Sequence, residues 1–183
     1  EVMPNTVVIM AGGLGTRLRP MTETTPKPML PLGGKPMLQH IIESLQREGF
    51  RDIVLSINYL GDQIEQHFGD GGTLGVNISY LSETKPLGTG GALSLLDRDF
   101  DAPVVVMNGD VLMAAKVGDI VRYHVDNEAE VTVGVKNLET QIPFGVLTLE
   151  GARIMGVEEK PTYRNFVNAG LYVLNPAVLK EIP

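Results

Sequence analysis

Residues 7–38, which read VVIMAGGLGTRLRPMTETTPKPMLPLGGKPML, decide the fold of this chain. The run opens with β-branched and other apolar residues and then changes to glycines, a pattern typical of a buried strand that ends in a tight turn. Basic residues and four prolines follow between residues 17 and 31. Because each proline fixes φ, this loop is stiff and loses little conformational entropy when a ligand binds. A stiff, basic, glycine-rich loop after a strand predicts a site for a triphosphate.

The charge of the chain restricts the classes of ligand that it can bind. The 183 residues have a formal net charge of −7, and an acidic surface repels the phosphate backbone of nucleic acids. The segment from residue 16 to residue 36 is the exception, with Glu23 as its single acidic residue and four basic ones, Arg17, Arg19, Lys27 and Lys35. A basic loop on an acidic protein predicts a small anionic ligand and no binding to nucleic acid.

The composition predicts a globular protein with no membrane partner. Hydrophobic residues make up 43% of the chain, which suffices for a core, and no segment approaches the ~20 consecutive apolar residues that cross a bilayer. The chain has no cysteine, so disulfides, thiolate chemistry and cysteine-bound metals are excluded. We expect a cytoplasmic protein, organised as one domain over residues 1–183.

Strand-like and helix-like segments alternate over the first two thirds of the chain. Apolar, β-branched runs predict strands at residues 6–11, 52–58, 77–82 and 102–110. Amphipathic spacing predicts helices at residues 36–48, 61–68, 89–96 and 117–127, the first of them capped by Gly49. This alternation predicts a mainly parallel sheet with helices on both faces.

From Glu130 onward the pattern changes to short strands separated by turns. Four such pieces are found, at residues 130–137, 144–150, 153–159 and 166–175. We expect them to extend the sheet as antiparallel or mixed strands. The predicted fold class is therefore α/β, a Rossmann-like three-layer sandwich with a mainly parallel, mixed central sheet.

The glycine-rich turn does not match the two best-known phosphate-binding loops. Gly12, Gly13 and Gly15 permit positive φ and let backbone N–H groups point at oxyanions. A Walker A loop needs Lys-Ser or Lys-Thr after its last glycine, where this chain has Thr-Arg, and a dinucleotide fingerprint needs a small residue where Leu18 stands. For the glycines alone, a tight turn without a ligand remains the alternative.

Residues 11–38 resemble the N-terminal signature of the sugar-1-phosphate nucleotidyltransferases, the enzymes that make nucleotide sugars. Later motifs follow in the order of that family, namely PLGTGGAL, NGDVL, FGV, EEKP and NAGLYV. The resemblance extends over essentially the whole chain. The PLGTGGAL and EEKP pattern is most similar to guanylyltransferases, in particular those of the mannose-1-phosphate guanylyltransferase type, and thymidylyl-, uridylyl- and cytidylyltransferases share most of it.

The nucleotide site implied by the resemblance combines the basic loop with the end of a later strand. It assigns Arg17 to the triphosphate and the departing pyrophosphate, and Lys27 to phosphates near the reacting centre. Asp110 closes the Asn-Gly-Asp turn after a predicted strand, where open α/β sheets bind ligands, and its carboxylate suits Mg²⁺. A solvated turn is the alternative for Asp110. The other nucleotide-binding residues that we expect are Ala11, Gly12, Gly13, Gly15, Thr16, Leu87, Gly88 and Thr89.

The resemblance places the sugar phosphate near the C-terminal motifs. Glu159 would accept hydrogen bonds from sugar hydroxyls and Lys160 would neutralise the phosphate, in keeping with the chemistry of a carboxylate and an ammonium. An exposed charge cluster is the alternative for this pair. Gly145, Asn168 and Gly170 are expected to line the sugar pocket.

The implied reaction joins a nucleoside triphosphate, with GTP favoured, to a sugar 1-phosphate and releases pyrophosphate. The attacking phosphate oxygen is already anionic, so alignment and charge neutralisation replace a general base. Two alternatives stay open. One is a regulatory homologue that binds a nucleotide sugar without making it, and the other is a thymidylyl- or uridylyltransferase of the same family.

One departure from the family concerns the end of the chain. The resemblance implies a second metal-binding aspartate well after the NAG segment, and the chain ends before it. We therefore expect a nucleotidyltransferase domain truncated at its C-terminal end, with further domains in the whole protein. A homo-oligomer is left open.

Overall fold

The computed structural model describes residues 2–83, 87–97, 99–112 and 115–182. Contacts divide the chain into two compact units. The first consists of Glu1–Gly134 together with Gly170–Pro183, and the second of Val135–Ala169. Each unit is built around its own sheet.

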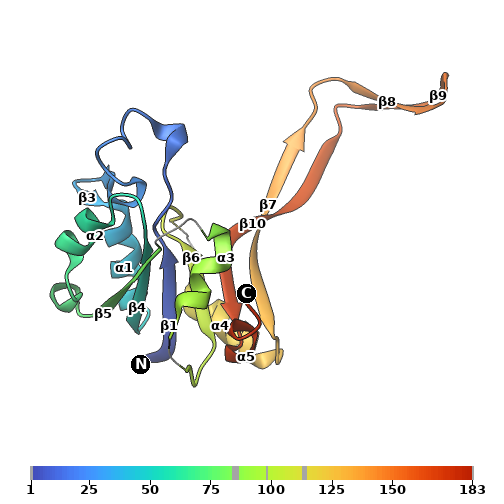
Figure 1. Cartoon of the computed structure of the whole chain (residues 1–183). Coiled ribbons are helices and arrows are strands. Elements are labelled where there is room, and N and C mark those ends of the chain that lie inside the picture. The colour runs from blue at the N-terminus through green and yellow to red at the C-terminus, as the bar shows by residue number, and fades with distance from the viewer. Residues whose placement is uncertain (1, 84–86, 98, 113–114, 183) are drawn as a thin grey trace. The chain divides into compact units, whose positions relative to one another are not determined.

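The first unit is built on a six-stranded sheet with the order β5-β4-β1-β6-β10-β7 (Figure 1). Its strands are β1 (Met3–Met10), β4 (Phe50–Ile57), β5 (Asn77–Ser82), β6 (Val104–Asn108), β7 (Val131–Gln141) and β10 (Thr162–Leu174). The part of β7 from Val135 onward and the part of β10 up to Ala169 belong to the second unit. β1 pairs in parallel with β4 and β6, and β4 pairs in parallel with β5. β10 runs antiparallel to β6. The sheet is therefore mainly parallel and mixed, as the sequence predicts.

The central strand β1 is buried on both faces. Val7 and Ile9 belong to one apolar cluster and Val8 to the other, and all three are fully buried. Side chains alternate along a strand, so a strand covered on both sides needs a continuous apolar run. The VVIM run is this strand, and its register pairs Met10 with Ser56 on one side and Asn108 on the other.

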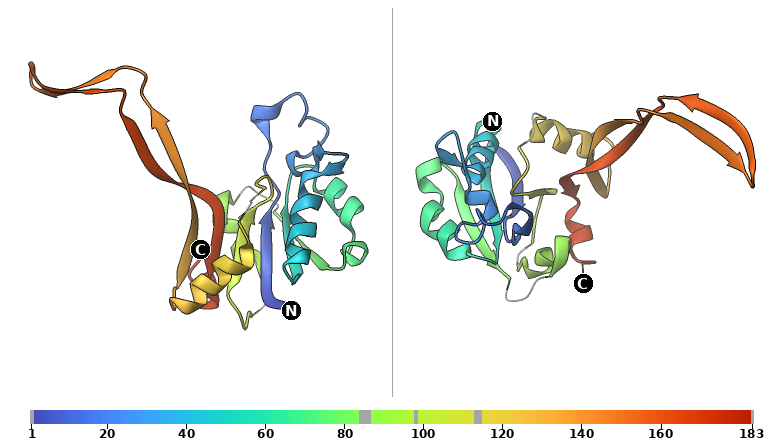
Figure 2. Two further views of the ribbon diagram at one scale, coloured as in Figure 1. Left: turned by 180° about the vertical axis from the view of Figure 1, so that it is seen from behind. Right: turned by 90° about the horizontal axis from the view of Figure 1, so that it is seen from above.

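Helices cover both faces of the sheet, which gives three layers (Figure 2). One face carries α1 (Met37–Arg47), α2 (Gly61–Phe68) and α4 (Val117–Asp126). The other face carries η4 (Ala92–Leu95), which continues α3 (Gly88–Gly91), and α5 (Pro176–Leu179). The Rossmann-like three-layer prediction is confirmed. Within the described part of the chain, every helix is too short or too polar to span a bilayer.

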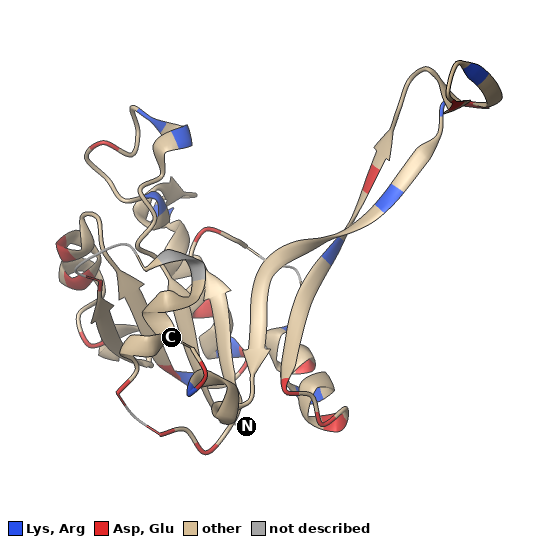
Figure 3. Ribbon diagram, turned by 45° about the vertical axis from the view of Figure 1, so that its right-hand side comes forward, with Lys and Arg blue, Asp and Glu red and all other residues tan. Residues whose placement is uncertain are grey.

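The two strands β1 and β6 differ in charge from the helices. β1 and β6 carry no acidic or basic residue, and the charged residues in the described part of the chain lie on other helices and strands and in loops (Figure 3). In α1 the buried side chains are Leu38, Ile41, Ile42 and Leu45, which share one helical face. After the helix, Gly49 adopts φ +101°, which a glycine takes without strain.

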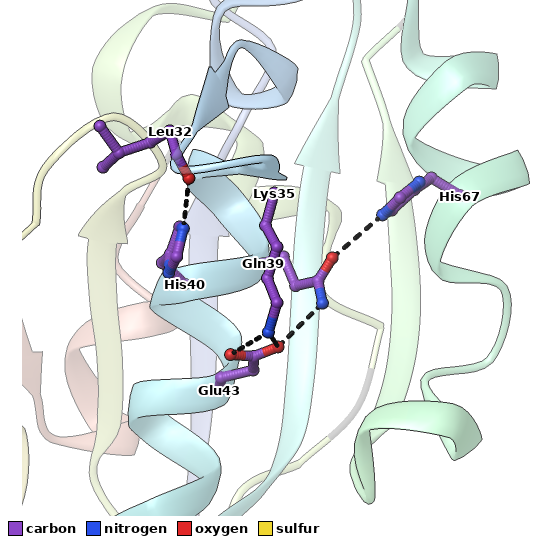
Figure 4. A network of polar contacts seen from close by, with 6 residues as sticks. All are labelled: Leu32, Lys35, Gln39, His40, Glu43 and His67. Carbon is purple, nitrogen blue, oxygen red and sulfur yellow. Dashed lines mark hydrogen bonds and ion pairs between the residues drawn. The ribbon is translucent and has the colours of Figure 1, made fainter.

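The outer face of α1 is joined to its surroundings by side-chain contacts (Figure 4). Lys35, on the two-residue strand β3 (Lys35–Pro36), donates to Glu43 at 2.9 Å, and Gln39 donates to the same carboxylate at 2.8 Å. These two hydrogen bonds, that from Lys35 foremost, lower the pKa of Glu43 below its ordinary value of 4.5. His40 Nε2 lies 2.8 Å from the carbonyl oxygen of Leu32, in β2 (Pro31–Leu32). The contacts fix the β2–β3 hairpin on the helix.

Two predicted elements differ from the structure in the first unit. The helix expected at residues 89–96 is divided into α3 and the 3-10 helix η4, because three of the four residues of α3 are glycines, which have low helix propensity. In the described ranges, three other short 3-10 helices occur in loops, namely η1 (Thr16–Leu18), η2 (Lys27–Met29) and η3 (Gly72–Leu74). The strand expected at residues 102–110 is limited to β6.

The second unit corrects the expectation that all four late strands extend the central sheet. β8 (Gly145–Glu150) and β9 (Arg153–Glu159) pair antiparallel with each other and form a separate two-stranded sheet. Their tight connection contains Gly151 at φ +59°, a conformation suited to a hairpin turn. Local pairing across a short turn satisfies the backbone groups with which the two strands face each other, and this pairing does not involve the central sheet.

His124, on α4, is the buried histidine of the described residues, with 2% of its surface exposed. Its Nδ1 lies 2.8 Å from the hydroxyl oxygen of Thr132, and its Nε2 has no hydrogen-bond partner in the described part of the chain. Burial lowers the pKa of His124 below its ordinary value of 6.5, because the cation would lose its hydration.

The lowered pKa of His124 predicts a pH-dependent stability. Above pH 6.5 the ring is neutral in both states and its contribution is complete. As the pH falls below 6.5, the unfolded chain takes up a proton that the folded protein does not, so the free energy of unfolding decreases until the folded pKa is reached. Each pH unit in this window contributes about 1.4 kcal/mol. Urea unfolding at pH 8.0 and pH 5.5 measures the loss.

His124→Asn removes the titrating ring and should flatten this pH dependence. His67→Gln, which replaces an exposed histidine on α2, should leave it unchanged. An equal pH dependence in the wild type and in His124→Asn would contradict the assignment.

Candidate active site

A cleft of about 430 Å³ lies at the carboxyl ends of the parallel strands of the first unit. It is lined by Met10, Ala11, Gly12, Gly13, Leu14, Lys27, Pro28, Asn58, Glu83, Asn108 and Asp110. These residues follow or end β1, β4, β5 and β6, or belong to η2. The carboxyl ends of parallel strands meet at the same edge, which is where open α/β sheets bind ligands.

The glycine-rich turn forms the wall of the cleft next to β1. Ala11 N donates to the carbonyl oxygen of Ser56 at 2.8 Å, so the chain remains tied to β4 as it leaves the strand. A Cβ added to Gly12 would lie 3.0 Å from the Cβ of Asn58, so the two chain segments touch there. A Cβ at Gly13 would meet open space, so the absence of a side chain keeps the cleft open.

Gly15 shapes the loop rather than the wall of the cleft. It adopts φ +60°, and its carbonyl oxygen accepts a hydrogen bond of 2.8 Å from the hydroxyl of Thr22. A Cβ at Gly15 would lie 2.9 Å from Thr22 Cγ2 and 3.2 Å from Lys27 Cβ. A glycine is therefore required here by conformation and by contact, and it leaves room for the stem of Lys27.

Lys27 and Asp110 form a hydrogen-bonded ion pair in the cleft. Lys27 begins η2 between Pro26 and Pro28, and Asp110 comes two residues after the end of β6. Their side chains are 32% and 33% exposed. The structure thus brings together two predicted site residues that are 83 positions apart in the sequence.

Arg17 and Thr16 lie on η1, on the same loop but outside the lining of the cleft. Both are exposed, and within the described part of the chain Arg17 makes no ion pair. Arg17 is therefore a free cation on the loop that leads away from the glycine turn.

Glu83, which follows β5, is hydrogen-bonded to the PLGTGGAL segment. Glu83 Oε1 accepts a hydrogen bond of 2.9 Å from the Ser56 hydroxyl, and Oε2 accepts one of 3.1 Å from the backbone N–H of Leu87. Leu87 precedes α3, whose first residues are Gly88 and Thr89. The preceding residues 84–86, which include the first proline of the motif, lie outside the described residues.

Three polar residues of the cleft lining were missed by the sequence analysis, namely Asn58, Glu83 and Asn108. Asn58 and Glu83 directly follow the strands β4 and β5, and Asn108 is the last residue of β6. The available signal was a polar residue at the carboxyl end of an apolar run, the same signal that indicated Asp110.

Gly170 packs against the side chain of Asn108, which lines the cleft. It adopts φ +71° in β10, and a Cβ there would lie 2.5 Å from Asn108 Nδ2. The predicted sugar-pocket residue Gly170 thus contacts a residue that lines the cleft. A glycine in an apolar strand is explained here by the close approach of a neighbouring side chain.

The remaining predicted sugar-site residues belong to the second unit. Gly145 pairs with Glu159 across β8 and β9, and a Cβ at Gly145 would lie 3.1 Å from Glu159 Oε2. Lys160 adopts φ +48°, donates its backbone N–H to Phe144 at 3.3 Å, and has Nζ 4.0 Å from Glu159 Oε1. Within this unit the hairpin therefore brings Gly145, Glu159 and Lys160 together. Asn168 lies on β10.

The carboxylates of the first unit fit a metal that is shared with a ligand. Among the described residues there is no group of three or more His, Asp or Glu side chains that could hold a metal ion by themselves. Mg²⁺ is commonly held by one or two carboxylates together with substrate phosphates. The chemistry of Asp110, a carboxylate in a cleft large enough for a nucleotide, fits this second arrangement.

Comparisons with known proteins agree with this α/β fold. A family model described as Nucleotidyl transferase matches residues 6–183. The chain therefore belongs to the nucleotidyl transferase family.

Two curated relatives illustrate the similarity. The mannose-1-phosphate guanyltransferase of Yarrowia lipolytica is 39% identical over 183 residues, which cover 96% of this chain and 50% of the relative. The mannose-1-phosphate guanylyltransferase of Mycobacterium tuberculosis is 38% identical over 182 residues, with the same two coverages. The chain thus spans about half the length of the curated relatives that it matches.

A solved structure gives the same result for the fold. HddC from Yersinia pseudotuberculosis, crystallised in complex with GMP-PN, superimposes with a TM-score of 0.75 and is 27% identical. The match covers 98% of this chain and 80% of HddC.

The contact between Gly170 and Asn108 predicts a specific loss of stability. In Gly170→Ala, the strain of a left-handed alanine adds to the clash with Asn108, so the free energy of unfolding should fall by about 2 kcal/mol or more. In Gly33→Ala the backbone has φ +60° but the added Cβ meets open space, so the strain acts alone. Urea unfolding of both variants compares the two. Equal losses would contradict a role for the contact with Asn108.

Proposed function

We propose that this chain carries the catalytic nucleotide site of a sugar-1-phosphate guanylyltransferase. The reaction would transfer GMP from GTP to the phosphate of a sugar 1-phosphate and release pyrophosphate. The observation that carries the proposal is the Lys27–Asp110 pair beside the glycine-rich turn, at the carboxyl edge of the sheet. The named relatives support mannose 1-phosphate as the sugar phosphate to test first.

The order of the strands supports one orientation of the nucleotide. Glu83 follows β5 and Asp110 follows β6, and these strands are separated by β4 and β1. Three strand spacings of ~4.8 Å place the two carboxylates roughly 14 Å apart along the edge. Phosphates are repelled by Glu83 and attracted by Lys27, so the triphosphate would lie between β1 and β6 and the base near β5.

The carboxylate of Glu83 supports guanine as the base. An ionised carboxylate only accepts hydrogen bonds, and it has about four acceptor positions. Ser56 and Leu87 occupy one on each oxygen and so fix the orientation of the group. Guanine offers two neighbouring donors, N1–H and the N2 amino group, on its pairing edge. The other bases place an acceptor next to each donor there, and this acceptor would face the carboxylate.

The remaining residues have roles in binding and charge neutralisation. Lys27 would neutralise the phosphates near the reacting centre, and Arg17 the triphosphate and the departing pyrophosphate. Lys160 would hold the phosphate of the sugar phosphate, Glu159 the sugar hydroxyls, and Gly145, Asn168 and Gly170 would line the sugar pocket. The nucleotide would contact the backbone of residues 11–16 and of Leu87, Gly88 and Thr89.

No general base is needed, because the attacking oxygen of the sugar phosphate is anionic at neutral pH. Asp110 would hold Mg²⁺, which when bound neutralises charge on the nucleotide phosphates. Catalysis would then rest on in-line alignment and on cations placed in advance of the reaction.

A pyrophosphate-release assay on the whole protein tests the reaction, with GTP and mannose 1-phosphate as substrates and Mg²⁺ as the added metal ion. Arg17→Ala and Asp110→Ala should each lower kcat by about 10²- to 10³-fold, because each removes a charge that stabilises the transition state. Lys35→Ala, outside the cleft, is the control. Nucleotide binding without pyrophosphate release in the wild type would instead indicate a regulatory binding protein.

The role of Glu83 predicts a change of base preference. Glu83→Gln introduces a donor beside an acceptor, so the ratio of kcat/KM for GTP over UTP should fall at least about tenfold. Glu48→Gln is the matched control, since Glu48 accepts a backbone hydrogen bond of 2.9 Å from Gly118 away from the cleft. A wild-type protein that prefers UTP or dTTP would contradict the assignment of guanine.

A further inference from the structure

We propose that the ion pair of Lys27 and Asp110 is an electrostatic latch that makes nucleotide binding and metal binding depend on each other. The inference rests on the proposed function, because it assigns Lys27 to phosphate and Asp110 to the metal. It goes beyond that function in stating that the two residues neutralise each other until both ligands are present.

The contacts of the pair support a latch. Lys27 Nζ and Asp110 Oδ2 are in direct contact, and both side chains line the cleft. Within the described part of the chain, neither group has a second ion-pair or side-chain hydrogen-bond partner. The charge of each group is thus compensated by the other alone.

The charge balance of the cleft gives the latch its effect. The charged residues of the described lining are Lys27, Asp110 and Glu83. Since Asp110 cancels the charge of Lys27, the ligand-free cleft offers a triphosphate no uncompensated cation. Arg17, which makes no ion pair within the described part of the chain, is not part of the lining.

A single ligand would bind against an unfavourable charge. A metal ion held by Asp110 alone would lie beside the Lys27 ammonium, and like charges repel. A phosphate held by Lys27 alone would lie beside the Asp110 carboxylate. When both ligands are present, Lys27 pairs with phosphate and Asp110 with the metal, and both repulsions are removed. By linkage, each ligand must raise the affinity for the other by the same factor.

The elements that hold the pair indicate which member moves. Asp110 has a short side chain and follows the buried strand β6, so its position is set by the sheet. Lys27 has a flexible four-carbon stem. Only the backbone end of this side chain is fixed, because Lys27 lies between two prolines and its Cβ lies against Gly15. Lys27 is therefore the member that exchanges partners.

The diagnostic measurement is the affinity for GTP without a metal. Asp110→Asn opens the latch, so the variant should bind GTP in EDTA about tenfold more tightly than the wild type, within the ~5- to 150-fold range of coupled sites. Losing a metal ligand cannot by itself produce this gain. Lys27→Met should bind Mn²⁺ alone about tenfold more tightly. Calorimetry measures GTP binding, and the electron paramagnetic resonance of free Mn²⁺ measures metal binding.

A double-mutant cycle separates pairing from a simple field effect. If Asp110 masks Lys27, then Lys27→Met should weaken metal-free GTP binding more in the Asp110→Asn background than in the wild type, by about tenfold. Independent charges would give equal losses in both backgrounds, and that result would overturn the latch. Lys35→Met and Asp119→Asn, which break the exposed pairs Lys35–Glu43 and Asp119–Arg122, are the controls and should change neither affinity.

The same titrations distinguish the latch from the function on which it rests. Wild-type protein that binds GTP with Mn²⁺, together with an Asp110→Asn variant that gains nothing in EDTA, would overturn the latch and leave the proposed function standing. Wild-type protein that binds GTP neither with Mn²⁺ nor in EDTA would overturn both.

Discussion

The parallel pairing of β1 with β4 and β6 is the constraint on which the rest of the first unit depends. Its register aligns Met10 with Ser56 and Asn108, so the three strands end at the same level. The chain leaves each strand there, and the loops that follow have no neighbouring strand to pair with. They form the wall of the cleft, which exists because β1 is buried and its neighbours are held in register.

The chemistry of the cleft follows from what these strand ends carry. The glycine turn supplies backbone to the wall of the cleft, Asp110 follows β6, and the proline-rich loop brings Lys27 to the same place. A cation and a carboxylate that face each other before a ligand arrives complement a metal–phosphate ligand, which carries both signs of charge. At the other end of the cleft, the Glu83 carboxylate accepts hydrogen bonds. That end is therefore suited to hydrogen-bond donors rather than to phosphate.

The glycines show how local and tertiary requirements differ. Gly15 and Gly170 both have positive φ, but each is also required by a neighbour from elsewhere in the structure, Thr22 for the first and Asn108 for the second. Gly12 has no unusual φ. It is required only because the chain after β4, at Asn58, approaches it closely. A glycine in a sequence indicates one of these causes without saying which.

The sequence by itself determined the alternation of strands and helices, the buried first strand and the family, because hydrophobic periodicity and turn residues are local properties of the chain. It also indicated Lys27 and Asp110 separately. Only the tertiary structure decided that these two pair, that Glu83 and Asn58 line the same cleft, and that β8 and β9 form a sheet of their own. The physical reason is that strand order and pairing partner depend on contacts between distant residues, and the pattern within a single strand is the same for any partner.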